Sequence, residues 1–82
     1  MAIISDELFL ERLGAYITHK RKRKGLGQKE VGLEVDQCQR DISEYENGDR
    51  MMKAILLFKL AEVLDMPLDD IMKKCMTVGQ NS

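Results

Sequence analysis

The N-terminal part of the chain carries apolar residues at helical spacing. They recur at intervals of four, three and one, which places them on one side of a helix: Phe9, Leu13, Tyr16 and Ile17. Ser5 precedes this stripe and is suited to cap a helix N-terminus, with two acidic residues following it. A first helix is therefore predicted from about residue 6 to residue 24, where Gly25 suits the position after a helix end.

The next stretch predicts two short helices joined by a turn. The first spans about residues 28–35 and the second about residues 39–47, with three polar or small residues between them. Each carries two apolar residues on one face: Val31 and Val35, then Ile42 and Tyr45. Both helices are too polar to be buried whole, so each is expected to keep one side on the protein surface.

The C-terminal third predicts two further helices. The segment from about residue 53 to residue 64 is the most apolar of the chain, and Pro67 prevents its simple continuation. Residues 68–76 restart a helical pattern, with two aspartates in the first turn. No run of five residues alternates between apolar and polar side chains as a half-buried strand would. The sequence therefore predicts an all-α fold of five helices.

Length and composition limit the chain to one small domain. Its 82 residues are 44% apolar and 33% charged, which is typical of a compact globule rather than a disordered chain. The longest uninterrupted apolar run has five residues, so neither a membrane span nor a signal peptide is expected. The two cysteines are far apart in the sequence and are expected to be reduced, which favours a cytoplasmic location.

The sequence lacks the residue patterns of an active site or a metal centre. Its one histidine, His19, has no cysteine or histidine partner at the spacing of a zinc site. There is also no Gly-rich phosphate loop and no recognisable pair of catalytic carboxylates. Neither a metal nor a cofactor is expected, and an enzyme is the least favoured class.

Charge is distributed unevenly along the chain. The five basic residues Lys20–Lys24 give the first 24 residues a net charge of +3, whereas residues 28–49 carry −5. The overall charge of −1 therefore conceals a basic run beside an acidic helix pair. Two short helices joined by a three-residue turn form the geometry that projects a helix into the major groove of DNA. The acidic segment predicts weak binding to DNA of arbitrary sequence.

Several positions taken together resemble a known family. They are Gly25-Leu26-Gly27-Gln28, Val31, Val35, Ile42-Ser43, Glu46-Asn47-Gly48 and Leu64. This register, over roughly residues 13–71, resembles the Cro and phage-repressor (Xre-like) helix-turn-helix family. The resemblance implies a single lambda-repressor-like DNA-binding domain over residues 1–82, with the helix-turn-helix at about 28–47 and helices four and five at about 53–76. It also implies a sequence-specific transcriptional regulator of prokaryotic or phage origin, acting as a repressor or autoregulator.

The resemblance assigns roles to individual residues. Base contacts are implied for Gln39, Arg40, Ser43 and Glu44, and phosphate contacts for Gln28, Asn47, Arg50 and Lys53. Gln28 is also expected to brace the recognition helix, which is the second helix of the motif. Arg21 and Glu46 are expected to form an ion pair that ties the first helix to the end of the recognition helix.

The chemistry of these side chains fits the implied roles. The Gln39 amide can pair with adenine N6 and N7, and the Arg40 guanidinium with guanine O6 and N7. Glu44 has two interpretations of equal weight, because it can accept from cytosine N4 or pair with Arg40 one turn earlier. Asp41 is expected to be a charge at the positive end of the helix dipole rather than a base contact.

Apolar residues beyond those that one small core needs predict a homodimer. The expected interface consists of Met52, Ile55, Leu56, Ile71 and Met72. A two-fold dimer would set two recognition helices one DNA turn apart on an inverted-repeat operator of double-stranded DNA. In the alternative, the fifth helix only closes the core of a single chain.

A protein-interaction module is the alternative function. An anti-regulator or an antitoxin-like partner would keep the helix-turn-helix fold but use its acidic side against a basic protein. The net charge of −5 over residues 28–49 is the feature that favours it. Selection of binding sites from random DNA would distinguish the two functions.

Overall fold

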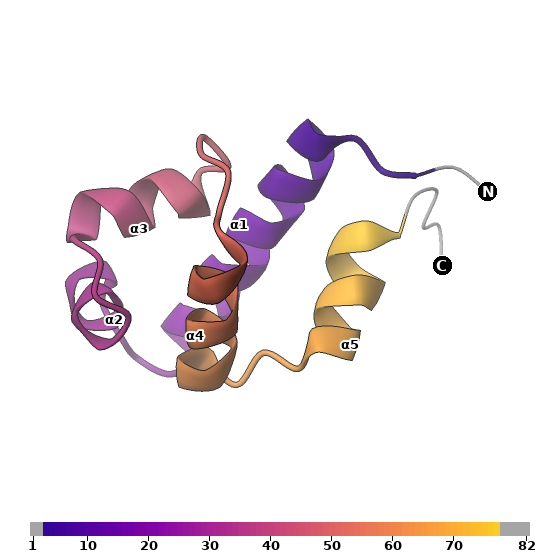
Figure 1. Cartoon of the computed structure of the whole chain (residues 1–82). Coiled ribbons are helices and arrows are strands. Elements are labelled where there is room, and N and C mark those ends of the chain that lie inside the picture. The colour runs from indigo at the N-terminus through magenta and orange to yellow at the C-terminus, as the bar shows by residue number, and fades with distance from the viewer. Residues whose placement is uncertain (1–2, 78–82) are drawn as a thin grey trace.

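The structure, a computed structural model, describes residues 3–77 of the chain. Its elements are α1 (Asp6–Arg23), α2 (Gln28–Glu34), α3 (Gln39–Glu46), α4 (Ala54–Leu64), α5 (Leu68–Ile71) and a π-helical turn η1 (Met72–Met76). Figure 1 shows α2 and α3 at one end of the molecule and α5 at the other, with α1 and α4 between them. The predicted all-α fold is confirmed. None of the helices in residues 3–77 combines the length and the apolarity of a membrane span.

The ends of α1 follow from the residues that flank it. The Ser5 hydroxyl accepts a hydrogen bond from the Leu8 amide at 3.2 Å, and two acidic residues lie in the first turn, where they suit the helix dipole. Basic residues fill the last turn, and Gly25 follows with a φ of 73°, which glycine adopts without strain. The predicted end of the helix is confirmed to within one residue.

Helices α2 and α3 pack against each other across a short turn. Asp36 in this turn has a φ of 62°, a left-handed conformation that aspartate tolerates better than most residues. Gly32 lies so close to the turn that a Cβ there would overlap the carbonyl oxygen of Gln37. The apolar residues expected to face inward are buried, namely Val31 in α2, Val35 at its C-cap, and Ile42 and Tyr45 in α3. This close approach fixes how α3 lies on α2.

Every α-helix contributes side chains to one hydrophobic core. Its buried residues are Leu13, Tyr16, Ile17, Val31, Val35, Ile42, Tyr45, Leu56, Leu60, Leu64, Met66, Ile71 and Cys75. The three leucines of α4 are spaced four apart and so share one face of that helix. Tyr16 donates a hydrogen bond to Asp70, and Arg12 donates one to the carbonyl oxygen of Thr77. These two bonds hold α5 and the end of η1 against α1.

The packing corrects part of the dimer interface expected from the sequence. Leu56 and Ile71 are 5% and 4% exposed, within the core of the single chain, so neither is free to contact a second copy. Met52 is half-buried and packs against that core, whereas Ile55 and Met72 are exposed. The expectation for Leu56 was wrong because α4 begins with a continuous apolar run, whose spacing does not reveal which side chains face inward.

Candidate nucleic-acid interface

Helix α3 presents one side to the core and the other outward, at the edge of the molecule (Figure 1). Ile42 and Tyr45 occupy the buried side. The opposite side is exposed or half-exposed, and it carries the four residues expected to contact bases: Gln39, Arg40, Ser43 and Glu44. The side chain of Arg40 is 86% exposed. Gln39 and Arg40 are therefore open to solvent, whereas Ser43 and Glu44 are half-exposed and Arg50 lies against Glu44.

Arg21 and Glu46 form the ion pair expected between α1 and the end of α3. Arg21 Nε donates to Glu46 Oε2 at 2.6 Å, and Arg21 Nη2 donates to Glu46 Oε1 at 3.0 Å. The third nitrogen, Nη1, donates to the carbonyl oxygen of Leu26 at 2.9 Å. Gln28 Nε2 also donates to Glu46 Oε1, at 3.0 Å. The first residue of α2 and the last turn of α1 thus hold the same carboxylate of α3.

This polar cluster is buried and satisfied. The side chains of Arg21 and Glu46 are 10% and 5% exposed. Burial alone would raise the pKa of Glu46, but the hydrogen bonds from Arg21 and Gln28 outweigh it and hold that pKa below its ordinary value. Hydrogen bonding to Glu46 likewise raises the pKa of Arg21. Both groups are therefore charged at neutral pH, and they fix the orientation of α3.

The backbone of α1 also touches the end of α3. A Cβ added at Gly14 would lie 2.7 Å from the carbonyl oxygen of Tyr45 and closer still to that of Glu46. Real Cβ atoms do not approach backbone oxygens so closely, so the two helices can meet here only at a glycine. Together with the buried ion pair, this contact gives α3 a rigid support on α1.

A second set of charges lies on the outward side of α3. Arg50, in the loop after α3, donates from Nη1 to Asp41 Oδ1 at 2.7 Å and to Glu44 Oε1 at 3.2 Å. The Arg50 guanidinium carbon is 5.1 Å from the centre of the Tyr45 ring. Glu44 Oε2 is in turn 3.5 Å from Arg40 Nε. We call Arg40, Asp41, Glu44 and Arg50 the α3 charge cluster.

The α3 charge cluster agrees only in part with the roles expected from the sequence. Of the two interpretations of Glu44, the pairing with Arg40 is present in the structure. Asp41 lies in the first turn of α3 as expected, but its partner is Arg50, nine residues later. The hydrogen bond from Arg50 holds the pKa of Asp41 below its ordinary value. Helical spacing could not reveal this pair, because the chain first reverses at Gly48, where φ is 74°.

Polar and basic residues flank α3 in the loops. Asn47 is the C-cap of α3 and Lys53 is the N-cap of α4, and both are exposed. Lys53 takes part in no ion pair within residues 3–77. In the basic run at the end of α1, Lys24 pairs with Asp65 at 2.8 Å. Two of the residues expected to contact phosphate, Asn47 and Lys53, are therefore open to solvent beside α3.

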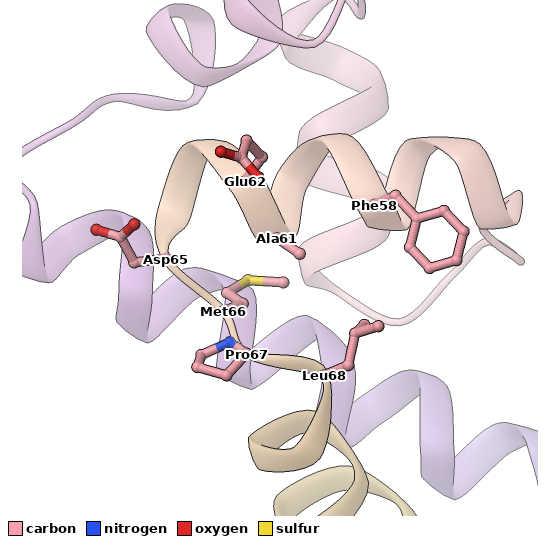
Figure 2. Close-up of a pocket in the computed structure, with 7 residues that line it drawn as sticks. All are labelled: Phe58, Ala61, Glu62, Asp65, Met66, Pro67 and Leu68. Carbon is pink, nitrogen blue, oxygen red and sulfur yellow. The ribbon is translucent and has the colours of Figure 1, made fainter.

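An exposed apolar surface lies between α4 and α5. Figure 2 shows a groove lined by Phe58, Ala61, Glu62, Asp65, Met66, Pro67 and Leu68. Phe58 is 52% exposed, and Leu68 is also exposed. No expectation from the sequence assigned Phe58 to this surface. Phe58 follows the exposed Ile55 by three positions, and that spacing is the signal that could have identified it.

The groups considered for metal binding lie apart. His19 is exposed on α1, Cys38 is exposed at the N-cap of α3, and Cys75 is buried in the core. Among the residues that the structure describes, no three His, Cys, Asp or Glu side chains gather as a metal ion would require. Burial raises the pKa of the Cys75 thiol, which keeps it protonated at neutral pH.

Several solved structures have the same arrangement of helices. The clp gene regulator ClgR from Corynebacterium glutamicum matches with a TM-score of 0.78 at 24% identity, over 87% of this chain and 76% of that chain. The restriction-modification controller protein C.AhdI from Aeromonas hydrophila matches with a TM-score of 0.70 at 24% identity, over 76% of this chain and 94% of that chain. The DNA-binding domain of BldD matches with a TM-score of 0.68 at 26% identity, over 83% of this chain and 97% of that chain. These likenesses show a common fold.

The sequence itself matches a family model, although no curated protein matches it. The model of the helix-turn-helix family covers residues 17–71, which hold the buried Arg21–Glu46 pair and all of α2, α3, α4 and α5. The family and the fold implied by the sequence resemblance are thereby confirmed. The chain belongs to the helix-turn-helix family of the Cro and phage-repressor (Xre) type, a family of DNA-binding transcriptional regulators rather than enzymes.

Proposed function

We propose that this protein regulates transcription as a homodimer that binds an inverted-repeat operator through α3, as a repressor or autoregulator. The observation that carries the proposal is the outward side of α3, where Gln39 and Arg40 are exposed at the N-terminal end of the helix. In this family the recognition helix enters the major groove with its N-terminal residues toward the bases. The fold shared with a gene regulator, a controller protein and a DNA-binding domain supports the same function.

Gln39 and Arg40 are the proposed base-reading residues. The planar amide of Gln39 matches adenine N6 and N7, and the Arg40 guanidinium matches guanine O6 and N7. Each such bidentate contact discriminates against a wrong base by about 1–3 kcal/mol. Arg40 is nearly free to do so, because the one ion pair that it makes within residues 3–77 is a surface contact of 3.5 Å to Glu44. Ser43 and Glu44 follow on the same side of α3 and are the proposed contacts to the neighbouring base pair.

Phosphate contacts are proposed for Gln28, Asn47, Arg50 and Lys53. The Gln28 amide nitrogen carries two hydrogens, so one can donate to Glu46 while the other donates to a phosphate. Asn47 and Lys53 are exposed beside α3, whereas two carboxylates already hold Arg50. Only cationic side chains release counterions, so if Arg50, Lys53 and part of the basic run at the end of α1 neutralise about three to four phosphates in each subunit, the logarithm of the dimer's affinity should fall with the logarithm of salt concentration at a slope of about −5 to −7.

The proposed dimer uses the exposed apolar side chains of α4, α5 and η1. Ile55 and Met72 remain from the interface expected from the sequence, and Phe58 and Leu68 take the place of the buried Leu56 and Ile71. An exposed apolar patch on a chain of this size is typical of a protein contact. A two-fold arrangement would repeat α3 at about 34–36 Å, which is one turn of DNA.

Selection from random double-stranded DNA tests the proposal. The full chain is incubated with a random duplex library at low salt, and bound DNA is amplified and sequenced over several rounds. We expect enrichment of an inverted repeat whose half-sites lie about 10–10.5 base pairs apart, centre to centre. Enrichment of no motif at low salt would contradict the proposal, and it would favour the protein-interaction module. Enrichment of a single half-site would retain base readout but contradict the dimer.

A further inference from the structure

Two carboxylates of the recognition helix hold Arg50. Its Nη1 donates to Asp41 at 2.7 Å and to Glu44 at 3.2 Å, and its guanidinium lies over the Tyr45 ring. The Arg50 side chain is 45% exposed, so it belongs to the surface that α3 presents to solvent. An arginine in this place is expected to donate to a DNA phosphate, but Asp41 and Glu44 already accept from it.

A backbone phosphate and the two carboxylates compete for the charge of the same guanidinium, although both carboxylates accept from Nη1 and leave its other N–H donors available. All three are anionic oxygen acceptors that suit the arginine fork. The four side chains of the α3 charge cluster carry two positive and two negative charges, so the cluster offers no net attraction to the phosphate backbone. Because attraction to phosphate supplies essentially all binding to arbitrary sequence, a neutralised Arg50 lowers that binding in particular.

Asp41 is the stronger of the two competitors. Its bond to Arg50 is 0.5 Å shorter than that of Glu44, the difference between 2.7 and 3.2 Å. Glu44 is also shared with Arg40, while the one ion pair that Asp41 makes within residues 3–77 is to Arg50. Ion pairs at an exposed surface contribute little to folding stability, so stability alone does not account for this pair.

We infer that Asp41, assisted by Glu44, competes with DNA phosphate for Arg50 and thereby sets the affinity of the protein for DNA of arbitrary sequence. This inference rests on the proposed function. Asp41 acts here as a positioning residue, since it holds Arg50 without contacting DNA. Lys53 is the contrasting case, because it lies in the same loop region and makes no ion pair within residues 3–77.

The test compares Asp41→Asn with Asp49→Asn, which removes the same charge one residue before Arg50. Asp49 is exposed and makes no ion pair in the described part of the chain. Binding of the full chain to a labelled duplex of scrambled sequence is measured by fluorescence anisotropy between 50 and about 200 mM salt. Asp41→Asn should bind more tightly than Asp49→Asn, and its salt slope should be steeper by about 0.9 per subunit. Over that fourfold range of salt, the added slope is an extra loss of about 3.5-fold per subunit.

Arg50→Gln shows whether the effect passes through Arg50. In that background, Asp41→Asn should gain no more affinity than Asp49→Asn, and its added slope should vanish. Glu44→Gln in the wild-type background should give a smaller change in the same direction as Asp41→Asn. Far-UV circular dichroism and thermal melting confirm that each variant is folded at the assay temperature, and Glu44→Gln keeps the comparison available if Asp41→Asn is not folded.

Three results would overturn the inference. In the first, Asp41→Asn and Asp49→Asn change the affinity for scrambled DNA and its salt slope equally. In the second, the gain in affinity from Asp41→Asn is unchanged in the Arg50→Gln background. Either result, combined with a motif selected by the wild-type protein, would remove the inference and leave the proposed function intact. In the third, neither the wild-type protein nor Asp41→Asn binds any duplex, and both the inference and the proposed function are then wrong.

Discussion

Glu46→Gln is the substitution that most directly tests how the recognition helix is held. Glutamine keeps the shape of the side chain but removes its charge and one of its two acceptor oxygens. In the native protein the carboxylate accepts two hydrogen bonds from Arg21 and one from Gln28. After the change, Arg21 keeps its bond to the Leu26 carbonyl oxygen but loses the opposite charge within a nearly buried site.

The structure gives the size of the expected loss. Breaking a buried ion pair by removing one partner costs about 3–5 kcal/mol. The Arg21 side chain is 10% exposed to solvent and would retain its hydrogen bond to the Leu26 carbonyl oxygen. The expected cost therefore lies at the lower end of this range, at about 3 kcal/mol. In a domain of this size each kcal/mol lowers Tm by about 4–8 °C, so the expected decrease is about 12–24 °C.

Urea unfolding followed by far-UV circular dichroism measures this loss, with Glu44→Gln as the matched control. Glu44 lies on the same helix two residues earlier and pairs only at the surface, so its replacement should cost no more than about 1 kcal/mol. The double variant Arg21→Met/Glu46→Leu should recover much of the loss, since it leaves no buried charge unpaired. If Glu46→Gln were no less stable than Glu44→Gln, the buried cluster would not be what holds α3.

Other perturbations follow from the same structure. Because folding lowers the pKa of Glu46, the stability difference between the wild-type protein and Glu46→Gln should be constant above the ordinary value of 4.5 and shrink as pH falls below it; a difference that grows in acid would contradict the pKa direction. Gly14→Ala should lower the free energy of unfolding by about 1–3 kcal/mol despite the better helix propensity of alanine, and an unchanged or higher Tm would show that α1 can move away from α3 freely. Phe58→Glu should convert the proposed dimer to monomers in analytical ultracentrifugation, and its Tm should stay near that of the dissociated wild-type protein. Leu56→Glu should instead unfold the domain, because Leu56 is buried. If Phe58→Glu remained a dimer, the interface would lie elsewhere.

Local signals in the sequence were sufficient for the helices. Ser5 and Gly25 mark the two ends of α1 by capping chemistry that acts within a few residues, and the structure follows them. Val31 and Ile42 lie in the core because each has an apolar partner four or three residues later, which defines one side of its short helix. The Arg21–Glu46 pair came from the family resemblance, since the two residues are 25 positions apart and no local pattern joins them.

The surface was harder to predict than the core. An apolar run such as Ala54–Phe58 supplies apolar side chains on every side of a helix, so its spacing does not separate the buried Leu56 from the exposed Ile55 and Phe58. The Asp41–Arg50 pair was missed because it depends on a reversal of the chain after α3. Both cases need the relative placement of elements, which the spacing of residues within one helix does not contain.

Base readout by α3 is the central claim, and one comparison tests it most directly. The affinities of wild-type, Arg40→Ala and Lys53→Ala proteins are measured on the selected operator and on a panel carrying each single base-pair change in one half-site. Arg40→Ala should lose about 1–3 kcal/mol on the operator and become indifferent to the base at one position, while Lys53→Ala should weaken binding to every duplex alike. Equal losses on every duplex from both variants would contradict the account, because Arg40 would then act as a phosphate contact rather than as a reader of sequence.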